Sequence, residues 1–431
     1  MLASYIVLPI EQFTLAVVIA YRDTFLGYMK KTLVGIALGR LLVGAGPTGP
    51  ETENPFALAG KAARQSPSGS VNYLLPQLEL RRLRSVYLTP ATAGVYWQAM
   101  ATYASLADET DSAAYYWQRF LGRSGTFLPQ AGKAPPLPLA EPAILAQTRF
   151  RQVVMFNEEH TQPRGRWLVG NLLPALYRQG FRYLAIEALA RSDSAGLRRR
   201  GYPVVGSGFY TNEPHFGNLL RAARQLGFRL VAYESEMVDR EQGQARNLLA
   251  ATIARQPDAR VLVLAGHAHI SETGALGGRS MAQWVRQLSH IDPLTIDQTQ
   301  AATDGLRSWQ RLPAGAYLAG PKNIANRYIT SDLYVFNHLR LTNAGNGFGQ
   351  PSARSVSLRV PADSLRVGQA HQLLVYWLAE MQAHADAEPV LVCCLGAGKA
   401  TSRATLLPGR YAVVLRDAHG QRRWQRVLQV P

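Results

Sequence analysis

Short apolar runs alternate with amphipathic segments through the middle of the chain, from residue 151 to about residue 288. The runs have the length of buried strands, and the segments between them repeat their apolar positions with the period of a helix. Gly180 and Gly227 stand where a predicted helix ends and the next strand begins. The pattern predicts an α/β fold with a mainly parallel sheet that helices cover on both faces. The expected strands lie within residues 151–160, 181–189, 228–236 and 260–270.

The pattern changes on both sides of this core, which we place at residues 148–350. Residues 51–147 combine helical periodicity with two Pro- and Gly-rich spacers, and they predict an N-terminal helical segment with linkers. Residues 351–431 contain short strand-like runs separated by Pro, Gly and Asp, which predicts a small β-sandwich-like module without a helix. In this module we expect a hairpin over residues 406–430 with its turn at 417–421.

The first 50 residues have the organisation of a targeting segment. After Met29 come two lysines, a short apolar stretch and small residues around Ala45, which is the order found in secretory signal peptides. We therefore expect residues 1–50 to be a signal peptide or N-terminal extension, with Met29 as the true start, and the protein to be exported to the periplasm or the cell exterior. The alternative is an N-terminal membrane helix or two that anchors the protein at the membrane or cell surface, because residues 5–21 are nearly long enough to cross a bilayer.

The charge of the chain changes this picture little. Its 431 residues include 46 Lys and Arg against 29 Asp and Glu, a formal net charge of +17 that raises the possibility of nucleic-acid binding. The arginines are scattered, however, and no long basic run with interleaved aromatic residues appears. We therefore expect no nucleic-acid partner. The two cysteines, Cys393 and Cys394, are neighbours on a predicted strand and point to opposite faces, so they are poorly placed to share a metal.

Acidic residues and histidines follow each of the four predicted core strands. In chain order they are Glu158 with His160, Glu187, Glu234, and His267 with His269. The carboxyl ends of parallel strands meet at one edge of a sheet, which is where ligands bind in folds of this kind. Residues two apart on an extended strand face the same way, so Glu158 and His160 should share a direction. We expect all these groups to lie along one rim of the sheet.

Such a rim can support two kinds of chemistry. A neutral imidazole beside a carboxylate can act as a general base on water. Alternatively, the same groups can bind a divalent metal such as Zn, Mn or Fe, whose bound water is activated. The expected ligands would then be Glu158, His160, Glu187 and His269. The sequence does not separate these two possibilities.

Three further residues are candidates for substrate binding, each with a structural alternative. His215 lies in a predicted loop before a helix and could reach over the rim, although a surface histidine would look the same. Glu234 could bind substrate or serve as an edge residue or helix cap. His267 could contact substrate or hydrogen-bond only the backbone.

The core resembles a known group of proteins, the erythromycin esterase-like, ChaN-like and Tiki/TraB group, over residues 148–290. Members share a strand that ends in Gly-Glu-x-His, a second strand that ends in Glu, and a later strand that leads into Gly-x-x-His. The matching positions are Asn157 in place of the glycine, Glu158, His160, Glu187, Gly266 and His269. The helix with Arg246 and Asn247 is similar to the helix that brings an arginine to the pocket in these proteins.

The resemblance implies a hydrolase or a ligand-binding protein. Erythromycin esterase-like members hydrolyse a lactone with a histidine that activates water, Tiki-type members resemble metal-dependent proteases, and ChaN-like members are linked to haem binding. We expect an exported hydrolase of a small-molecule or peptide substrate, with His160 as base, Glu158 or Glu187 orienting it, and His269 with Arg246 holding the substrate or its oxyanion. One alternative is a non-catalytic protein that binds haem or another ligand. The other is that the C-terminal β module docks the protein on a partner or cell surface.

Overall fold

The computed structural model describes residues 53–122 and 137–431, except for residue 68 and gaps at 275–277, 305–306, 325–326, 342–344, 349, 367 and 396–399. Glu53–Pro431 form one compact unit. The predicted signal peptide and its alternative, an N-terminal membrane helix, lie outside the described residues. Within the described ranges, no helix combines the length and the apolar character that crossing a bilayer requires.

A seven-stranded sheet forms the centre of the α/β core, with the order β3-β2-β4-β1-β5-β7-β6. All neighbouring strands are parallel except β6 and β7, which are antiparallel. The four strands predicted in the core are the first four along the chain. The strands are β1 Val153–Glu158, β2 Phe181–Ile186, β3 Arg229–Ala232, β4 Arg260–Gly266, β5 Leu294–Asp297, β6 Ala316–Ala319 and β7 Leu333–Asn337.

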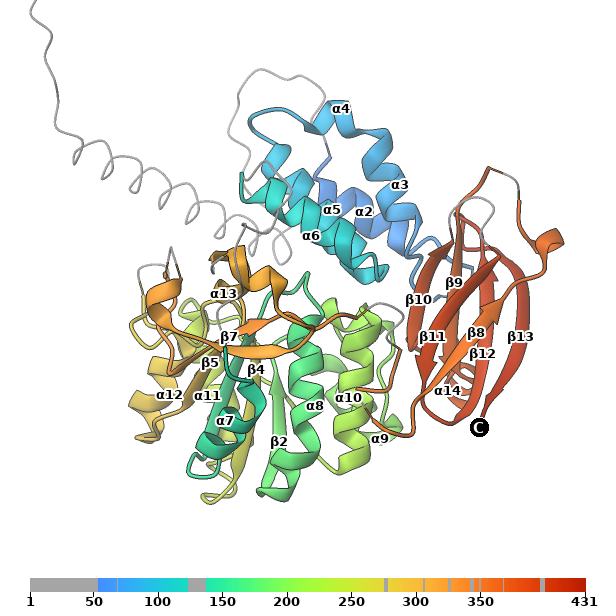
Figure 1. The fold of residues 1–431 in the computed structure, drawn as a ribbon. Helices are drawn as coiled ribbons and strands as arrows, with labels where there is room; N and C mark the ends of the chain where they lie inside the picture. Colours follow the sequence, from blue (N-terminus) through green and yellow to red (C-terminus); the bar gives the residue numbers. More distant parts are fainter. Residues whose placement is uncertain are drawn as a thin grey trace, which may run out of the picture. The chain divides into compact units, whose positions relative to one another are not determined.

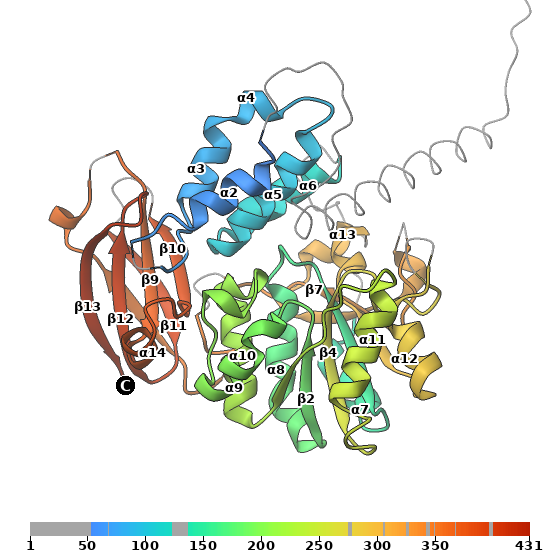
Figure 2. The same cartoon turned by 180° about the vertical axis from the view of Figure 1, so that it is seen from behind.

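Helices cover both faces of this sheet (Figures 1 and 2). On β1, Val154 and Phe156 pack against the helices on one face, whereas Val153 and Met155 pack against those on the other. A strand that is buried on both faces needs apolar residues at every position, which explains the uninterrupted runs in the sequence. The predicted fold class is therefore confirmed. The helices of the core are α7 Ala140–Thr148, α8 Arg164–Arg178, α9 Ser194–Arg200, α10 Pro214–Leu226, α11 Arg240–Ala251, α12 Met281–Ser289 and α13 Gln300–Asp304.

The N-terminal helical segment packs against the C-terminal module. Tyr96 and Met100 of the segment share one apolar cluster with Leu374 and Val414 of the module. The prediction placed residues 140–147 in this segment, but they form α7, which packs against α8 and β6 of the core. The helices of the segment are α2 Pro55–Ala63, α3 Leu75–Arg82, α4 Arg84–Tyr87, α5 Ala93–Leu106 and α6 Thr110–Phe120.

The C-terminal module contains a four-stranded sheet, β10-β9-β12-β13, and a two-stranded sheet, β11-β8. The predicted hairpin is confirmed as β12–β13, and Asp417 Oδ1 accepts hydrogen bonds from the amides of His419 and Gln421 in its turn. The expectation of no helix was wrong, because α14 Leu378–Ala383, rich in helix-forming residues, follows β9. The strands are β8 Arg354–Arg359, β9 His371–Trp377, β10 Leu391–Leu395, β11 Thr401–Leu406, β12 Gly409–Arg416 and β13 Arg422–Val430.

Candidate functional site

The carboxyl ends of β1, β2 and β4 meet at Gly266, the last residue of β4. The pairing of β1 with β4 sets Glu158 beside Gly266, and the Gly266 amide donates a 2.5 Å hydrogen bond to Glu187 Oε2. A Cβ atom at position 266 would lie 2.9 Å from both Glu187 Oε2 and His160 Nε2. Because glycine has no side chain, the glutamate and the imidazole can border the same space.

His160 and Glu158 form a hydrogen-bonded dyad that Arg166 anchors. His160 Nδ1 lies 2.9 Å from Glu158 Oε1, and Arg166 donates to Glu158 Oε2 and to the His160 carbonyl, both at 2.8 Å. Burial opposes ionisation of Glu158, but Arg166 and then His160 hold the pKa of this carboxyl below its usual value. The ionised carboxylate can only accept, so Nδ1 carries the proton and the lone pair of the neutral ring is on Nε2. Tyr210 stacks on this ring with the centroids 4.1 Å apart.

Glu187 lies across the space from His160, between the cations Arg240 and His269. Its Oε1 accepts from Arg240 Nη2 at 2.5 Å and lies 3.2 Å from His269 Nε2. Burial opposes ionisation, yet His269 and Arg240 hold the pKa of Glu187 well below its usual range. Burial also opposes protonation of His269, but Glu187 and Glu241 raise its pKa to about 10, and Glu241 Oε1 lies 2.6 Å from His269 Nδ1. At neutral pH this imidazole is therefore a cation. Arg240 also binds both carboxylate oxygens of Glu234.

His267 belongs to a neighbouring contact group on the same rim. Its Nε2 lies 3.0 Å from Glu159 Oε2, and its ring stacks on Tyr328. Asn157, which replaces the glycine of the resembling group, donates to the His267 carbonyl at 2.9 Å and to Asp297 Oδ2 at 2.8 Å. Asn157 thus ties the ends of β1, β4 and β5 together.

Two residues predicted to bind substrate lie elsewhere. Arg246 is exposed on α11, and Arg240, at the start of the same helix, is the arginine that reaches Glu187. His215 is completely buried, where its Nδ1 accepts from Trp167 Nε1 at 2.9 Å. The structure thus places neither side chain on the rim, because sequence position does not say which side of a helix faces the rim or whether a loop is covered. Their role in substrate binding stays a prediction.

Sequence reasoning missed three residues of the site, namely Arg166, Arg240 and Tyr210. Arg166 lies in the first turn of α8 and is completely buried. Arg240 is the first residue of α11. Both arginines lie near the start of a helix that follows a core strand. Such a position is only a weak signal of a site residue, because the chain contains many other arginines. The sequence holds no signal that pairs Tyr210 with His160, two residues beyond the end of β1.

A metal fits poorly at either cluster that could hold one. Among the described residues, only Asp108, Glu213 and His215 offer three ligand atoms close enough to share an ion. A metal on His215 Nε2 would leave the proton on Nδ1, where it would oppose the indole N–H of Trp167. On the rim, Arg166 and Arg240 already bind the carboxylates of the predicted ligands Glu158 and Glu187. A metal ligated by Glu158, His160, Glu187 and His269 stays a prediction.

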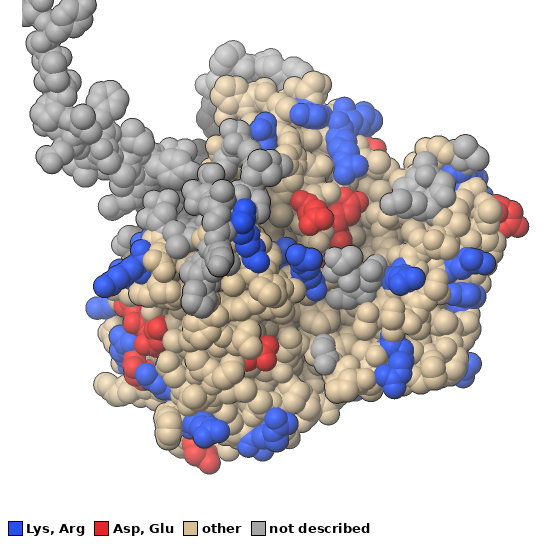
Figure 3. Space-filling model, in the orientation of Figure 1, with Lys and Arg blue, Asp and Glu red and all other residues tan. Residues whose placement is uncertain are grey.

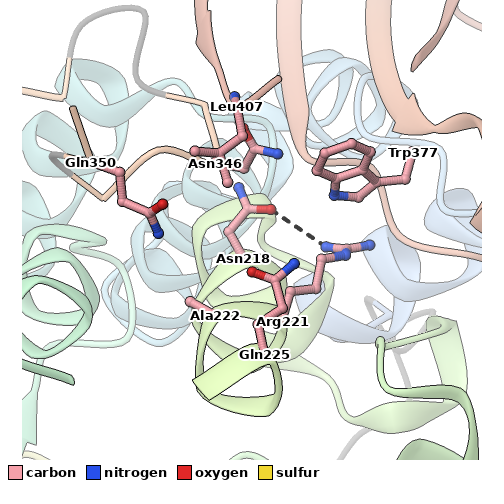
Figure 4. A pocket seen from close by; sticks show the side chains of 8 residues that line it. All are labelled: Asn218, Arg221, Ala222, Gln225, Asn346, Gln350, Trp377 and Leu407. Carbon is pink, nitrogen blue, oxygen red and sulfur yellow. Dashed lines mark hydrogen bonds between the residues drawn. The ribbon is translucent and has the colours of Figure 1, made fainter. Parts of the chain in front are cut away.

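A small pocket lies away from the rim, where α10 faces the C-terminal module (Figure 4). It is lined by residues that include Asn218, Arg221, Trp377 and Leu407. Arg221 forms a salt bridge with Glu380 at 2.6 Å, and Asn218 donates to the Val390 carbonyl at 2.8 Å. These polar groups hold α10 against the module, so we assign the pocket no ligand.

Lys and Arg side chains form no single basic patch on the face shown in Figure 3, where they are dispersed among uncharged residues. The expectation of no nucleic-acid partner stays a prediction.

No family model matches the chain, and no curated protein matches its sequence. Several solved structures are similar in part, including the following three. One described as bacterial protein toxins has 15% identity and a TM-score of 0.29, over 52% of this chain and 45% of that one. The type III effector HopBA1 has 14% identity and a TM-score of 0.28, over 49% and 100%. RRSP, a MARTX toxin effector domain from Vibrio vulnificus CMCP6, has 15% identity and a TM-score of 0.29, over 61% and 67%.

The chain thus spans less than half the length of the first of these structures. Likenesses at these scores carry no argument about activity. The resemblance to the erythromycin esterase-like, ChaN-like and Tiki/TraB group stays a prediction.

Proposed function

We propose that the protein is a hydrolase in which His160 is the general base that activates water. The observation that supports this is the dyad itself, with Glu158 buried to 2% exposure behind His160, whose side chain is 24% exposed. The buried carboxylate fixes the tautomer and the orientation of the ring, and Nε2 is the nitrogen left to accept a proton. Among the described residues, His160 Nε2 has no hydrogen-bond partner.

Arg240 and His269 supply positive charge on the other side of the same space. In the proposed reaction His160 Nε2 takes a proton from water, and the hydroxide attacks a carbonyl carbon. The negative charge that develops on the carbonyl oxygen is stabilised by Arg240, whose Nη1 binds no carboxylate among the described residues. Protonated His269, whose two ring nitrogens face Glu187 and Glu241, contributes through its charge alone. Glu187 stabilises the imidazolium of His160, which then returns its proton to the leaving alkoxide or amine. The substrate class is an ester or amide of a small molecule or peptide.

We propose the reaction without a metal, because guanidinium groups already balance the charge of the buried Glu158 and the partly buried Glu187. Arg166 lies against Glu158, and Arg240 lies against Glu187. Fixed cations beside carboxylates weaken the attraction of the site for a divalent ion. The metal-dependent variant and the ligand-binding alternative are outcomes that the experiment separates.

The test is hydrolysis of a panel of esters and peptides by purified protein, with and without a chelator. His160→Gln should lower kcat by at least about a hundredfold, since a positioned general base contributes that much or more. His419→Gln, at an exposed histidine in the β12–β13 turn, is the matched control and should retain full activity. Equal activity in wild type and His160→Gln would refute the role of the dyad. Loss of activity with the chelator would favour the metal, and a Soret band on adding haem without turnover would favour ligand binding.

A further inference from the structure

The N-terminal helical segment touches the core through residues 209–215, which we call the bridging segment. Three contacts enter it from the helical segment, one from α5 and two from the loops beside its helices. Tyr103 packs edge-on against Phe209, with the ring centroids 6.2 Å apart. Tyr73 Oη donates to the Asn212 carbonyl at 3.0 Å. Asp108 Oδ1, in the turn between α5 and α6, lies 3.0 Å from His215 Nε2.

The same bridging segment holds the dyad from its other side. Tyr210 stacks on the ring of His160. Glu213 accepts from Arg166 Nη1 at 2.7 Å, while the rest of that guanidinium binds Glu158. The segment therefore alternates between residues that contact the helices and residues that contact the catalytic pair or its anchor.

His215 is locked into one orientation at the end of the bridging segment. Its Nδ1 accepts from the indole of Trp167, which is the residue after Arg166 on α8. Nε2 must then carry the proton and donate to Asp108. Asp108 itself has a left-handed backbone, with φ of 59°. Aspartate adopts this conformation more readily than most residues, because its short polar side chain can hydrogen-bond locally.

We propose that the helical segment is a positioning element of the proposed catalytic site, and that Asp108 and Tyr73 are positioning residues that act through the bridging segment. The inference rests on the proposed function for its catalytic consequence. Its structural consequence can be measured without turnover, because loosening the contacts with the helical segment should move Tyr210 off the ring of His160. It also assigns the helices a role within the site.

The experiment uses the full chain with labelled histidine. A stacked phenol ring shifts the ring protons of His160 upfield, and this shift is read by NMR, assigned with His160→Gln and calibrated with Tyr210→Leu. Asp108→Ala and Tyr73→Phe each remove one helical contact, and each should lose about half or more of the upfield shift. Asp108→Asn retains an acceptor oxygen for His215 and should behave as wild type. Glu79→Ala removes an exposed ion pair with Arg82 in the same segment and is the matched control.

Activity provides the second measurement. Displacement of a catalytic group by a fraction of an ångström to one ångström costs about ten- to a hundredfold in rate. Asp108→Ala and Tyr73→Phe should therefore lower kcat about tenfold, with KM within about twofold of wild type. If Asp108→Ala does not fold, the test uses Tyr73→Phe alone. This variant should fold, because it removes only one hydroxyl group.

The two proposals fail separately. A wild-type protein without hydrolytic activity, whose His160 shift is still lost in Tyr73→Phe, would refute the hydrolase and support the positioning role. An active wild type, whose His160 shift and kcat are the same in Asp108→Ala, Tyr73→Phe and Glu79→Ala, would overturn the inference and leave the hydrolase intact.

Discussion

Replacing His269 with glutamine should remove a pH-dependent part of the folding free energy. The carboxylates of Glu187 and Glu241 outweigh the effect of burial and raise the His269 pKa from its ordinary value of 6.5 to about 10. A tenfold change in proton affinity is worth about 1.4 kcal/mol. The protonated ring therefore stabilises the native state by up to about 5 kcal/mol. Removal of one partner from a buried ion pair typically costs roughly 3–5 kcal/mol, so the two figures agree in order of magnitude.

The sign of the effect determines where it is measured. Because the His269 pKa is higher in the folded than in the unfolded protein, the stabilisation is complete below pH 6.5 and is lost as the pH rises toward about 10. The His269→Gln variant lacks it at every pH. The difference in unfolding free energy between wild type and variant should be several kcal/mol near pH 6 and should shrink steadily toward pH 10.

The assay is urea unfolding at closely spaced pH values across this range, followed by tryptophan fluorescence. His419→Gln should run parallel to wild type at every pH, since this histidine is exposed. A difference between wild type and His269→Gln that stays constant from pH 6 to pH 10 would refute the assigned charge state.

Three further substitutions test other contacts of the structure. Gly266→Ala places a Cβ atom 2.9 Å from Glu187 Oε2 and His160 Nε2, so we expect kcat to fall about ten- to a hundredfold with a small change in melting temperature; an unchanged kcat would show that this space is not used. Arg240→Gln should destabilise the protein by about 2 kcal/mol at pH 7, because it removes the charged hydrogen bonds to the partly buried Glu187 and Glu234 and leaves His269 as the one remaining cation described beside Glu187. Because the pKa of Glu187 is depressed in the folded protein, its ionised form stabilises the fold above the ordinary pKa of 4.5, and this stabilisation is lost as the pH falls. The destabilisation by Arg240→Gln should therefore be smaller at pH 3 than at pH 7. An equal destabilisation at both pH values would contradict the ion pair. Glu388 is buried, its Oε2 has no partner among the described residues, and burial raises the pKa of this carboxyl well above 4.5. The wild type should therefore lose stability relative to Glu388→Gln as the pH rises from 4.5. Denaturant midpoints at pH 5 and pH 8 should show the variant gaining about 1 kcal/mol of relative stability at the higher pH.

Local pattern alone was enough to predict the sheet and the edge at which acids and histidines gather. The runs that became β1, β2 and β4 are apolar at most positions, because a parallel strand between two helical layers is buried on both faces. The run that became β3 is shorter and only partly buried, because β3 lies at the edge of the sheet. The carboxyl ends of such strands lie on one side of the sheet, so acids and histidines placed just after them share a rim without further information. The β12–β13 hairpin was equally local, since its turn residues are contiguous in the chain.

The partners on that rim were decided only by tertiary packing. Arg240 and Arg246 lie on the same helix, and the sequence cannot say that only the first faces Glu187. Arg166 resembles a surface arginine until α10 covers it and brings Glu213 to it.

Contacts between distant parts of the chain had the same limit. The contact of Asp108 with His215 joins residues 107 positions apart. Periodicity reports which face of one element is buried, whereas ion pairs and hydrogen bonds depend on the packing of several elements against one another. The sequence by itself thus determined the α/β core and where its acids and histidines gather, and the tertiary structure decided their charges, their partners and the place of the helical segment beside them.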